Sequence, residues 1–360
     1  MKILILFILL ICSFKADAQY DDIRKEINTL IKYETSIDFK STPGFIVGMI
    51  DGDSSYILSF GCRSLEDKSS ILKNDVFELG GVTKIYTAMI VTSMVNEKKL
   101  SLYSSINDYL AIKNPAFDSC TLFKLLTHTS GLPKFPPGWG RIEKDSQDPY
   151  AAFDQKELED FFRKYKPNSF SKNEYLYSHL NYVLTVWILE SISGLNYGEL
   201  LKKYLPSNIL GSIEHIPTVA GFGLNVKEVK PWSSISYHGA IGIKGSLIDL
   251  MNICQLFIRD TSIYQTMLKT YPSRIQKNKS WVALGWQALP IPKHRFVFAH
   301  TGRTQGHHTF VGIMPDTKTA VVILANSAKG SDVLGLNILN MMNNNWKRKT
   351  ITKGSIGNGQ

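Results

Sequence analysis

The pattern of apolar and polar residues divides the chain into strand-rich ends and a helical middle. Apolar residues between Asp22 and Thr35 recur at helical spacing, which predicts an amphipathic helix. Two runs rich in β-branched and aromatic residues follow, Phe45 to Ile50 and Tyr56 to Phe60. The turn-forming sequence Asp51-Gly52-Asp53 separates them, so this region is predicted to be a β-hairpin.

Helical patterns dominate from Phe77 to about residue 270, with loops predicted at Pro133 to Gly140 and at Gly221 to Ser236. Three strands and a closing helix are predicted after them, at Phe296 to Ala299, Thr309 to Ile313, Thr319 to Leu324 and Val333 to Met342. The pattern therefore predicts an α+β fold, with one antiparallel sheet built from both chain ends, flanked by helices, and a large mainly helical insertion. We place the sheet part at about 19–75 and 280–345 and the helical part at about 76–279. A site is expected in the crevice between the two parts.

The first eighteen residues have the pattern of a secretory signal peptide. Met1 and Lys2 precede an unbroken apolar run from Ile3 to Cys12, and Ala16-Asp17-Ala18 supplies small residues for cleavage after Ala18. The alternative is a membrane anchor, but ten apolar residues are fewer than the roughly 20 needed to span a bilayer. We therefore expect a secreted or periplasmic protein with no transmembrane segment after cleavage.

Charge and cysteine content narrow the function classes. The chain of 360 residues has a net charge of +10, part of it in a basic C-terminal segment at 346–360, predicted to be a flexible tail. Attraction of this tail to an anionic envelope surface or polymer is the alternative. A secreted chain with no recognisable nucleic-acid module is not expected to bind nucleic acid. After cleavage the odd, widely spaced set Cys62, Cys120 and Cys254 predicts neither a disulfide framework nor a zinc site.

The stretch from Phe77 to Ala88 has the pattern of the start of a long buried helix. In acyl-enzymes with the S-x-x-K motif, Ser and Lys lie three residues apart on one helix face, so that Lys can accept the Ser proton. Here Lys84 has the Lys position, and Gly81 stands where the nucleophilic Ser would be. Thr83 cannot replace it, because two residues along a helix point about 200° apart.

Five stretches together resemble the serine β-lactamase and penicillin-binding-protein superfamily, most closely its class C β-lactamase, D-aminopeptidase and esterase branch. The resemblance covers about residues 40 to 330. The stretches are Phe77 to Ala88, Leu125 to Pro133, Tyr177-Ser178-His179 at the family's Tyr-x-Asn motif, Gly242 to Leu250, and His300-Thr301-Gly302 with Gly306 following. The resemblance implies that the chain has the β-lactamase/transpeptidase-like fold.

The resemblance also implies a role for each site residue. Lys84 and Tyr177 would accept the proton of the attacking Ser, Lys84 if its pKa is lowered and Tyr177 if nearby cations favour its phenolate. His300, Thr301 and Gly302 would lie on an edge strand that binds the substrate carbonyl or carboxylate. His179 replaces the usual amide that positions substrate.

Each assignment has a structural alternative. Lys84 could be an exposed helix lysine, Tyr177 a core tyrosine and His300 a strand-end residue facing solvent. For His128 we favour the structural role, at the end of a helix before a turn. The adjacent His307 and His308 show no metal-ligand spacing and are predicted to face opposite sides of a strand. No metal or cofactor is expected.

Two functions remain open. The first is a secreted protein that has lost acyl-enzyme chemistry because of Gly81 and binds a peptidoglycan-like peptide, an ester or a protein partner, or serves as a scaffold. The second is an active hydrolase of the β-lactamase, D-alanyl-D-alanine peptidase or esterase type. It would use water activated by Lys84 or Tyr177, or belong to a lineage that retains the Ser. An adhesion module would not need Lys84, Tyr177 and His300 together. The substrate and the oligomeric state stay open.

Overall fold

The computed structural model describes residues 20–33, 37–140, 148–151, 153–166, 174–209, 211–213, 216–233, 235–259, 262–275, 278–293 and 295–346. The predicted signal peptide and the predicted tail beyond residue 346 lie outside these residues. In the described part of the chain, no helix is long and apolar enough to cross a membrane.

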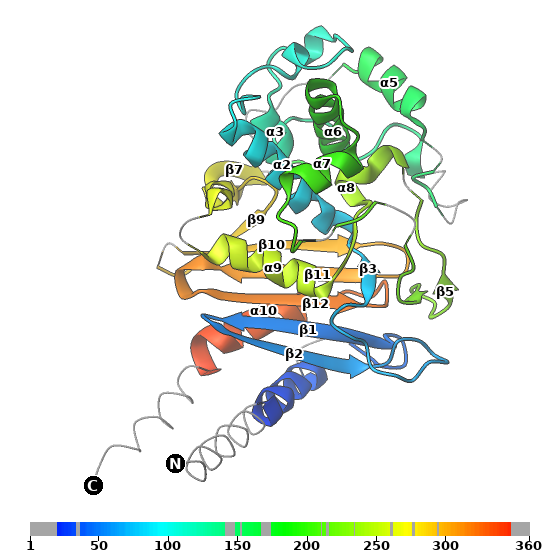
Figure 1. Ribbon diagram of the computed structural model, residues 1–360, viewed down its shortest axis with the longest axis vertical. Coiled ribbons are helices and arrows are strands. Elements are labelled where there is room, and N and C mark those ends of the chain that lie inside the picture. The colour runs from blue at the N-terminus through cyan, green and yellow to red at the C-terminus, as the bar shows by residue number, and fades with distance from the viewer. Residues whose placement is uncertain are drawn as a thin grey trace.

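An eight-stranded antiparallel sheet joins the two ends of the chain (Figure 1). Its order is β2-β1-β12-β11-β10-β9-β8-β7, and β1 pairs with β12 along its full length. The strands are β1 (Gly44–Asp51), β2 (Ser54–Gly61), β7 (Tyr271–Ile275), β8 (Asn278–Val282), β9 (Gln287–Ile291), β10 (Arg295–Arg303), β11 (His308–Met314) and β12 (Thr319–Ala325). The predicted antiparallel sheet from both termini is confirmed, as is the hairpin turn, where Gly52 adopts the positive φ that the turn requires.

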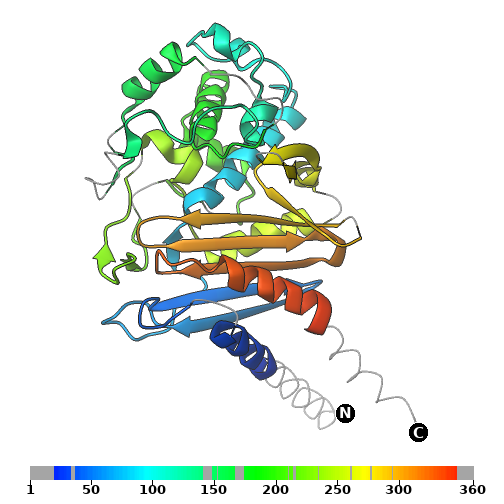
Figure 2. The same cartoon turned by 180° about the vertical axis from the view of Figure 1, so that it is seen from behind.

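Helices cover both faces of this sheet, because its central strands are apolar on both sides. On one face, the helix at 20–33 and α10 (Asp332–Met341) pack against a core that includes Phe45, Phe310 and Ile323 (Figure 2). On the other face, α9 (Leu247–Ile258) and the helical part share one larger core with the sheet (Figure 1). Strands β11 and β12 are buried at every position, as expected for strands covered on both faces.

The helical part is organised around α2 (Thr83–Asn96), which is buried on nearly all sides. Around it lie α3 (Leu122–Leu126), α5 (Gln155–Lys164), α6 (Leu180–Ser193), α7 (Tyr197–Tyr204) and α8 (His238–Ile241). Capping boxes start α5, α7 and α9, from Asp154, Asn196 and Ser246. The 3-10 turn η1 (Gly80–Val82) leads into α2, and the strand before it, β3 (Val76–Glu78), pairs with β6 (Lys244–Ser246).

Two parts of the sheet were not predicted. Strands β7 to β9 place the start of the C-terminal sheet part at Tyr271, earlier than the predicted residue 280. Pro272 and Pro290 interrupt the alternation there, and Pro272 is tolerated because β7 is an edge strand. A small hairpin, β4 (Gly221–Phe222) and β5 (Glu228–Val229), also lies inside a predicted loop.

Candidate active-site cleft

The residues predicted for the site converge on one cleft. The turn η1 carries Gly81, α2 carries Lys84, the segment before α6 carries Tyr177 and His179, and β10 carries His300 to Gly302. A cleft of 630 Å³ is lined by Gly81, Tyr177, His179, His300 and Thr301, among others. The sheet and the helical part thus meet at the place where the motifs predicted a site.

The space beside Gly81 is closed. A Cβ atom added to Gly81 would lie 2.7 Å from the Thr301 carbonyl oxygen, 3.0 Å from the Tyr177 hydroxyl and 3.2 Å from His300 Cε1. Cβ atoms in proteins do not approach a backbone oxygen so closely. The adjoining contact is equally tight, since a Cβ on Gly302 would lie 1.9 Å from the Leu79 carbonyl oxygen. The turn η1 and strand β10 therefore pack backbone against backbone where a nucleophile would project.

Lys84 is fully buried, which excludes the exposed helix lysine. Its Nζ donates to the Ala240 carbonyl at 2.8 Å and lies 3.2 Å from His179 Nδ1. It also sits over the Tyr177 ring, 4.9 Å from the centroid. Burial first, and the positive charge of Lys134 second, hold the pKa of Lys84 well below its usual range. The Nζ can therefore donate to both the Ala240 carbonyl and His179 Nδ1.

Tyr177 is half-buried and lines the cleft. Burial raises the pKa of its phenol, so the hydroxyl keeps its proton at neutral pH. Burial therefore disfavours the phenolate that a Tyr177 base requires, even though Lys84 lies close to its ring. Because the hydroxyl lies 3.0 Å from the Cβ position of Gly81, it occupies the entrance to the nucleophile's place and can donate a hydrogen bond to a ligand.

Three buried histidines surround Tyr177, and burial is the main cause that lowers the pKa of each: His128, His179 and His300, the last to about 3. His128 Nδ1 accepts from the Ser178 amide at 3.1 Å, and its ring lies 4.6 Å from that of Tyr177. His300 Nδ1 lies 2.8 Å from the Thr301 carbonyl, to which it donates. His128 thus packs and fixes the segment that carries Tyr177, whereas His179 and His300 face the cleft.

The sequence did not reveal the buried carboxylate of Glu78, which connects the two walls of the cleft. Its Oε1 accepts from the Trp232 amide at 2.7 Å, and its Oε2 accepts from the Thr304 hydroxyl at 2.9 Å. His307 Nδ1 lies 3.2 Å from the same Oε2, and Nε2 donates to the Val219 carbonyl at 3.0 Å. The sequence feature that could have indicated this role is an acidic residue between two apolar ones, in Phe77-Glu78-Leu79. An acidic side chain that is buried needs a partner.

Replacing Glu78 with glutamine tests this connection. The amide oxygen can still accept from Trp232, and the amide nitrogen can donate to Thr304 and to a neutral His307. We therefore expect a folded protein about 1–2 kcal/mol less stable, measured by urea unfolding. Amide hydrogen exchange of Trp232 should remain slow in this variant and become fast in Glu78→Ala. Equal exchange in all three proteins would show that Glu78 does not hold the walls together.

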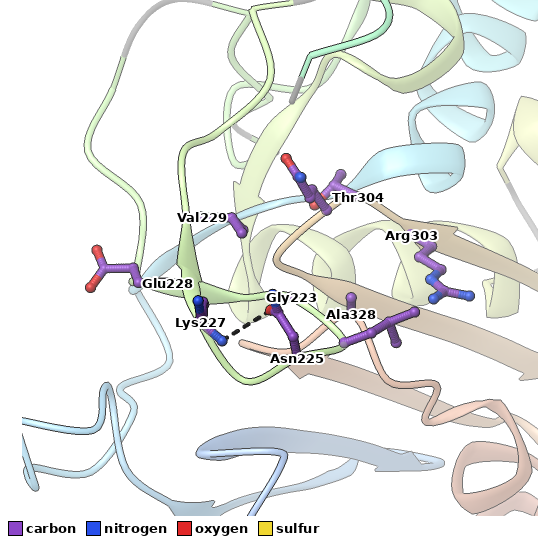
Figure 3. A pocket seen from close by; sticks show the side chains of 10 residues that line it. Gly223, Asn225, Lys227, Glu228, Val229, Arg303, Thr304 and Ala328 are labelled. Carbon is purple, nitrogen blue, oxygen red and sulfur yellow. Dashed lines mark hydrogen bonds between the residues drawn. The ribbon is translucent and has the colours of Figure 1, made fainter. Parts of the chain in front are cut away.

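The cleft presents cations and aromatic rings. Lys134 and Arg303 line it together with Phe135, Tyr150 and Trp232, and its lining contains no Asp or Glu. A second hollow of 510 Å³, between the β4–β5 hairpin and the β10–β11 turn, shares Arg303 and Thr304 with the cleft (Figure 3). No group of three or more His, Cys, Asp or Glu within the described ranges could hold a metal ion. The arrangement offers hydrogen bonds and positive charge to a ligand.

Known proteins are similar to this chain over most of its length. The sequence model of the beta-lactamase family matches residues 34–340. A beta-lactamase of Providencia stuartii is 22% identical over 364 residues, covering 89% of this chain and 91% of that protein. Penicillin-binding protein 4* of Bacillus subtilis (strain 168) is 25% identical over 338 residues, covering 86% of this chain and 73% of that protein.

Solved structures agree with these matches. The crystal structure of a beta-lactamase/D-alanine carboxypeptidase from Pseudomonas syringae has a TM-score of 0.77 at 16% identity, covering 91% of this chain and 99% of that one. A class C beta lactamase from Rhodobacter sphaeroides has a TM-score of 0.72 at 20% identity, covering 88% of this chain and 99% of that one. Since the family's sequence model matches most of the chain and the fold is shared, the protein belongs to the beta-lactamase family.

Proposed function

We propose that this protein is a secreted, non-acylating member of the family that binds a small anionic ligand such as a peptidoglycan-like peptide. One observation carries the proposal: the place of the nucleophile is both without a side chain, at Gly81, and closed by the Thr301 carbonyl oxygen. Serine acyl-enzyme chemistry needs a hydroxyl within reach of a base and a substrate carbonyl. Secretion is supported by the leader sequence before residue 19.

The ligand class follows from the charges of the cleft. Lys134, whose charge acts on Lys84 and His179, would attract a carboxylate, while the protonated Tyr177 hydroxyl would donate to a carbonyl or carboxylate oxygen. Phe135 and Trp232 give apolar surface for the body of the ligand. Because one protein of the same fold is described as a beta-lactamase/D-alanine carboxypeptidase, a peptide ending in D-alanine is the first probe we would use.

Two measurements test the proposal on the wild-type protein. We expect no covalent adduct with labelled penicillin or a fluorophosphonate by intact-protein mass spectrometry. Acetyl-D-Ala-D-Ala should quench or shift tryptophan fluorescence, and its C-terminal amide should bind at least ~10-fold more weakly, because it lacks the charge. Lys134→Gln should weaken binding similarly, while Lys156→Gln on exposed α5 should not. A stoichiometric penicillin adduct would overturn the non-acylating assignment.

The lowered pKa of Lys84 favours one other function, hydrolysis by activated water. A neutral Lys84 amine could accept a proton from water held near Gly81. Lys84 itself, however, does not line the cleft, and Tyr177 stands between. Turnover of a chromogenic ester by the wild-type protein, lost in Lys84→Met, would establish this function in place of binding.

A further inference from the structure

Most of the net positive charge lies in one segment. Residues 261–315 contain no Asp or Glu and seven Lys or Arg, so they carry +7 of the chain's +10. The cations are Lys269, Arg274, Lys277, Lys279, Lys293, Arg295 and Arg303. One of them, Arg303, belongs to the cleft, Lys277 lies outside the described residues, and the others lie along strands β7 to β10 or beside them. The ligand site therefore does not account for this charge.

The sheet topology brings three of these cations, Arg274, Lys279 and Lys293, toward one end. Strands β7, β8, β9 and β10 are successively antiparallel, so β7 and β9 end where β8 and β10 begin, at the same end of the sheet. Arg274 pairs with Lys279 and Pro272 with Trp281, which places these residues on one face. This end of the sheet is called the basic hairpin tip, and it comprises Arg274, Ile275, Lys279, Trp281, Leu289 and Lys293.

Apolar side chains are exposed on both faces of this end of the sheet: Trp281 shares a face with Arg274 and Lys279, and Ile275 and Leu289 lie on the opposite face. Ile275 is 46% exposed, and Trp281 and Leu289 are each 37% exposed. Trp281 contacts Phe296, with ring centroids 5.6 Å apart, yet more than a third of its surface remains open. Glu174, bridged to Arg274 through the backbone, offsets part of the positive charge. A surface that combines an exposed Trp, aliphatic side chains and several cations matches the headgroup region of a bilayer.

We propose that the basic hairpin tip binds the surface of an anionic phospholipid bilayer. The tip approaches the bilayer end-on, so that its cations lie near anionic headgroups while Trp281 on one face and Ile275 and Leu289 on the other enter the boundary between headgroups and acyl chains. An anionic polymer would satisfy the cations but would leave the apolar side chains in water. The bilayer is favoured for that reason. Binding at the tip does not depend on what the cleft binds.

Vesicle co-sedimentation tests the proposal, with the secreted protein and vesicles of phosphatidylglycerol and phosphatidylcholine. We expect binding that rises with the phosphatidylglycerol fraction and falls with salt. The double variant Arg274→Glu/Lys279→Glu should lower the partition coefficient at least ~10-fold, because two attractive charges become repulsive. Trp281→Ser should lower it several-fold and remove a vesicle-induced blue shift of tryptophan fluorescence.

A matched variant controls for net charge. Lys156→Glu/Lys164→Glu changes the charge equally on the exposed surface of α5, in a different part of the molecule (Figure 2), and should bind vesicles like the wild type. Binding lost equally in both double variants would show a nonspecific charge effect and overturn the proposal. So would binding that depends on the tail residues Lys347 and Lys349 and not on the tip. Charge dependence without any effect of Trp281→Ser would assign the tip to an anionic polymer instead.

Discussion

Replacing Gly81 with serine is expected to destabilise the protein by about 3 kcal/mol and to give no acyl-enzyme. The new Cβ would lie 2.7 Å from the Thr301 carbonyl oxygen, and a backbone oxygen in a packed strand cannot move aside as a side-chain end can. Overpacking in a buried site typically costs about 1–3 kcal/mol, and the backbone contact places this substitution at the upper end. Restoring the family's residue therefore does not restore the family's chemistry.

Urea unfolding and labelled penicillin provide the measurements for this variant. Gly140→Ser is the matched control, because a Cβ added to Gly140 meets no atom within 4 Å and should change stability by less than about 0.5 kcal/mol. If Gly81→Ser were as stable as the wild type and bound penicillin covalently, the site would be open and intact. The missing hydroxyl would then be the only defect, as expected for an active lineage that retains the Ser.

The sequence was sufficient for the overall fold because the relevant signals are local. Two runs rich in β-branched and aromatic residues and the turn at Asp51-Gly52-Asp53 specify the β1–β2 hairpin without reference to the rest of the chain. Motif order then brought Lys84, Tyr177 and His300 into one predicted site, and the structure places all three around Gly81.

Three features could not be predicted, because they depend on contacts distant in sequence. Strands β7 to β9 contain prolines and polar residues, and only pairing with β10 identifies them as part of the sheet. Glu78 meets Trp232 and Thr304, which lie more than 150 residues away. The closure beside Gly81 is a distance between backbones that no motif records.

Mild acid is expected to destabilise the protein strongly, by about 4 kcal/mol between pH 7.5 and pH 5.5. Three buried histidines, His128, His179 and His300, have pKa values lowered in the folded state, chiefly by burial. In the unfolded chain a histidine titrates near pH 6.5. The unfolded state therefore binds more protons below pH 6.5, and stability present at higher pH is lost as the pH falls.

The magnitude and the cause can be checked together. Each such histidine contributes about 1.4 kcal/mol per pH unit below 6.5, so three contribute about 4 kcal/mol by pH 5.5. His238 and His308, whose pKa values burial lowers to about 4, add to this loss, whereas Asp332, whose pKa burial raises to about 6, acts with the opposite sign. Urea unfolding at constant ionic strength should show the loss, and His300→Asn should reduce it by about 1.4 kcal/mol. An unchanged slope in that variant, or stability independent of pH over this range, would show that the histidines around Tyr177 are not held neutral by the fold.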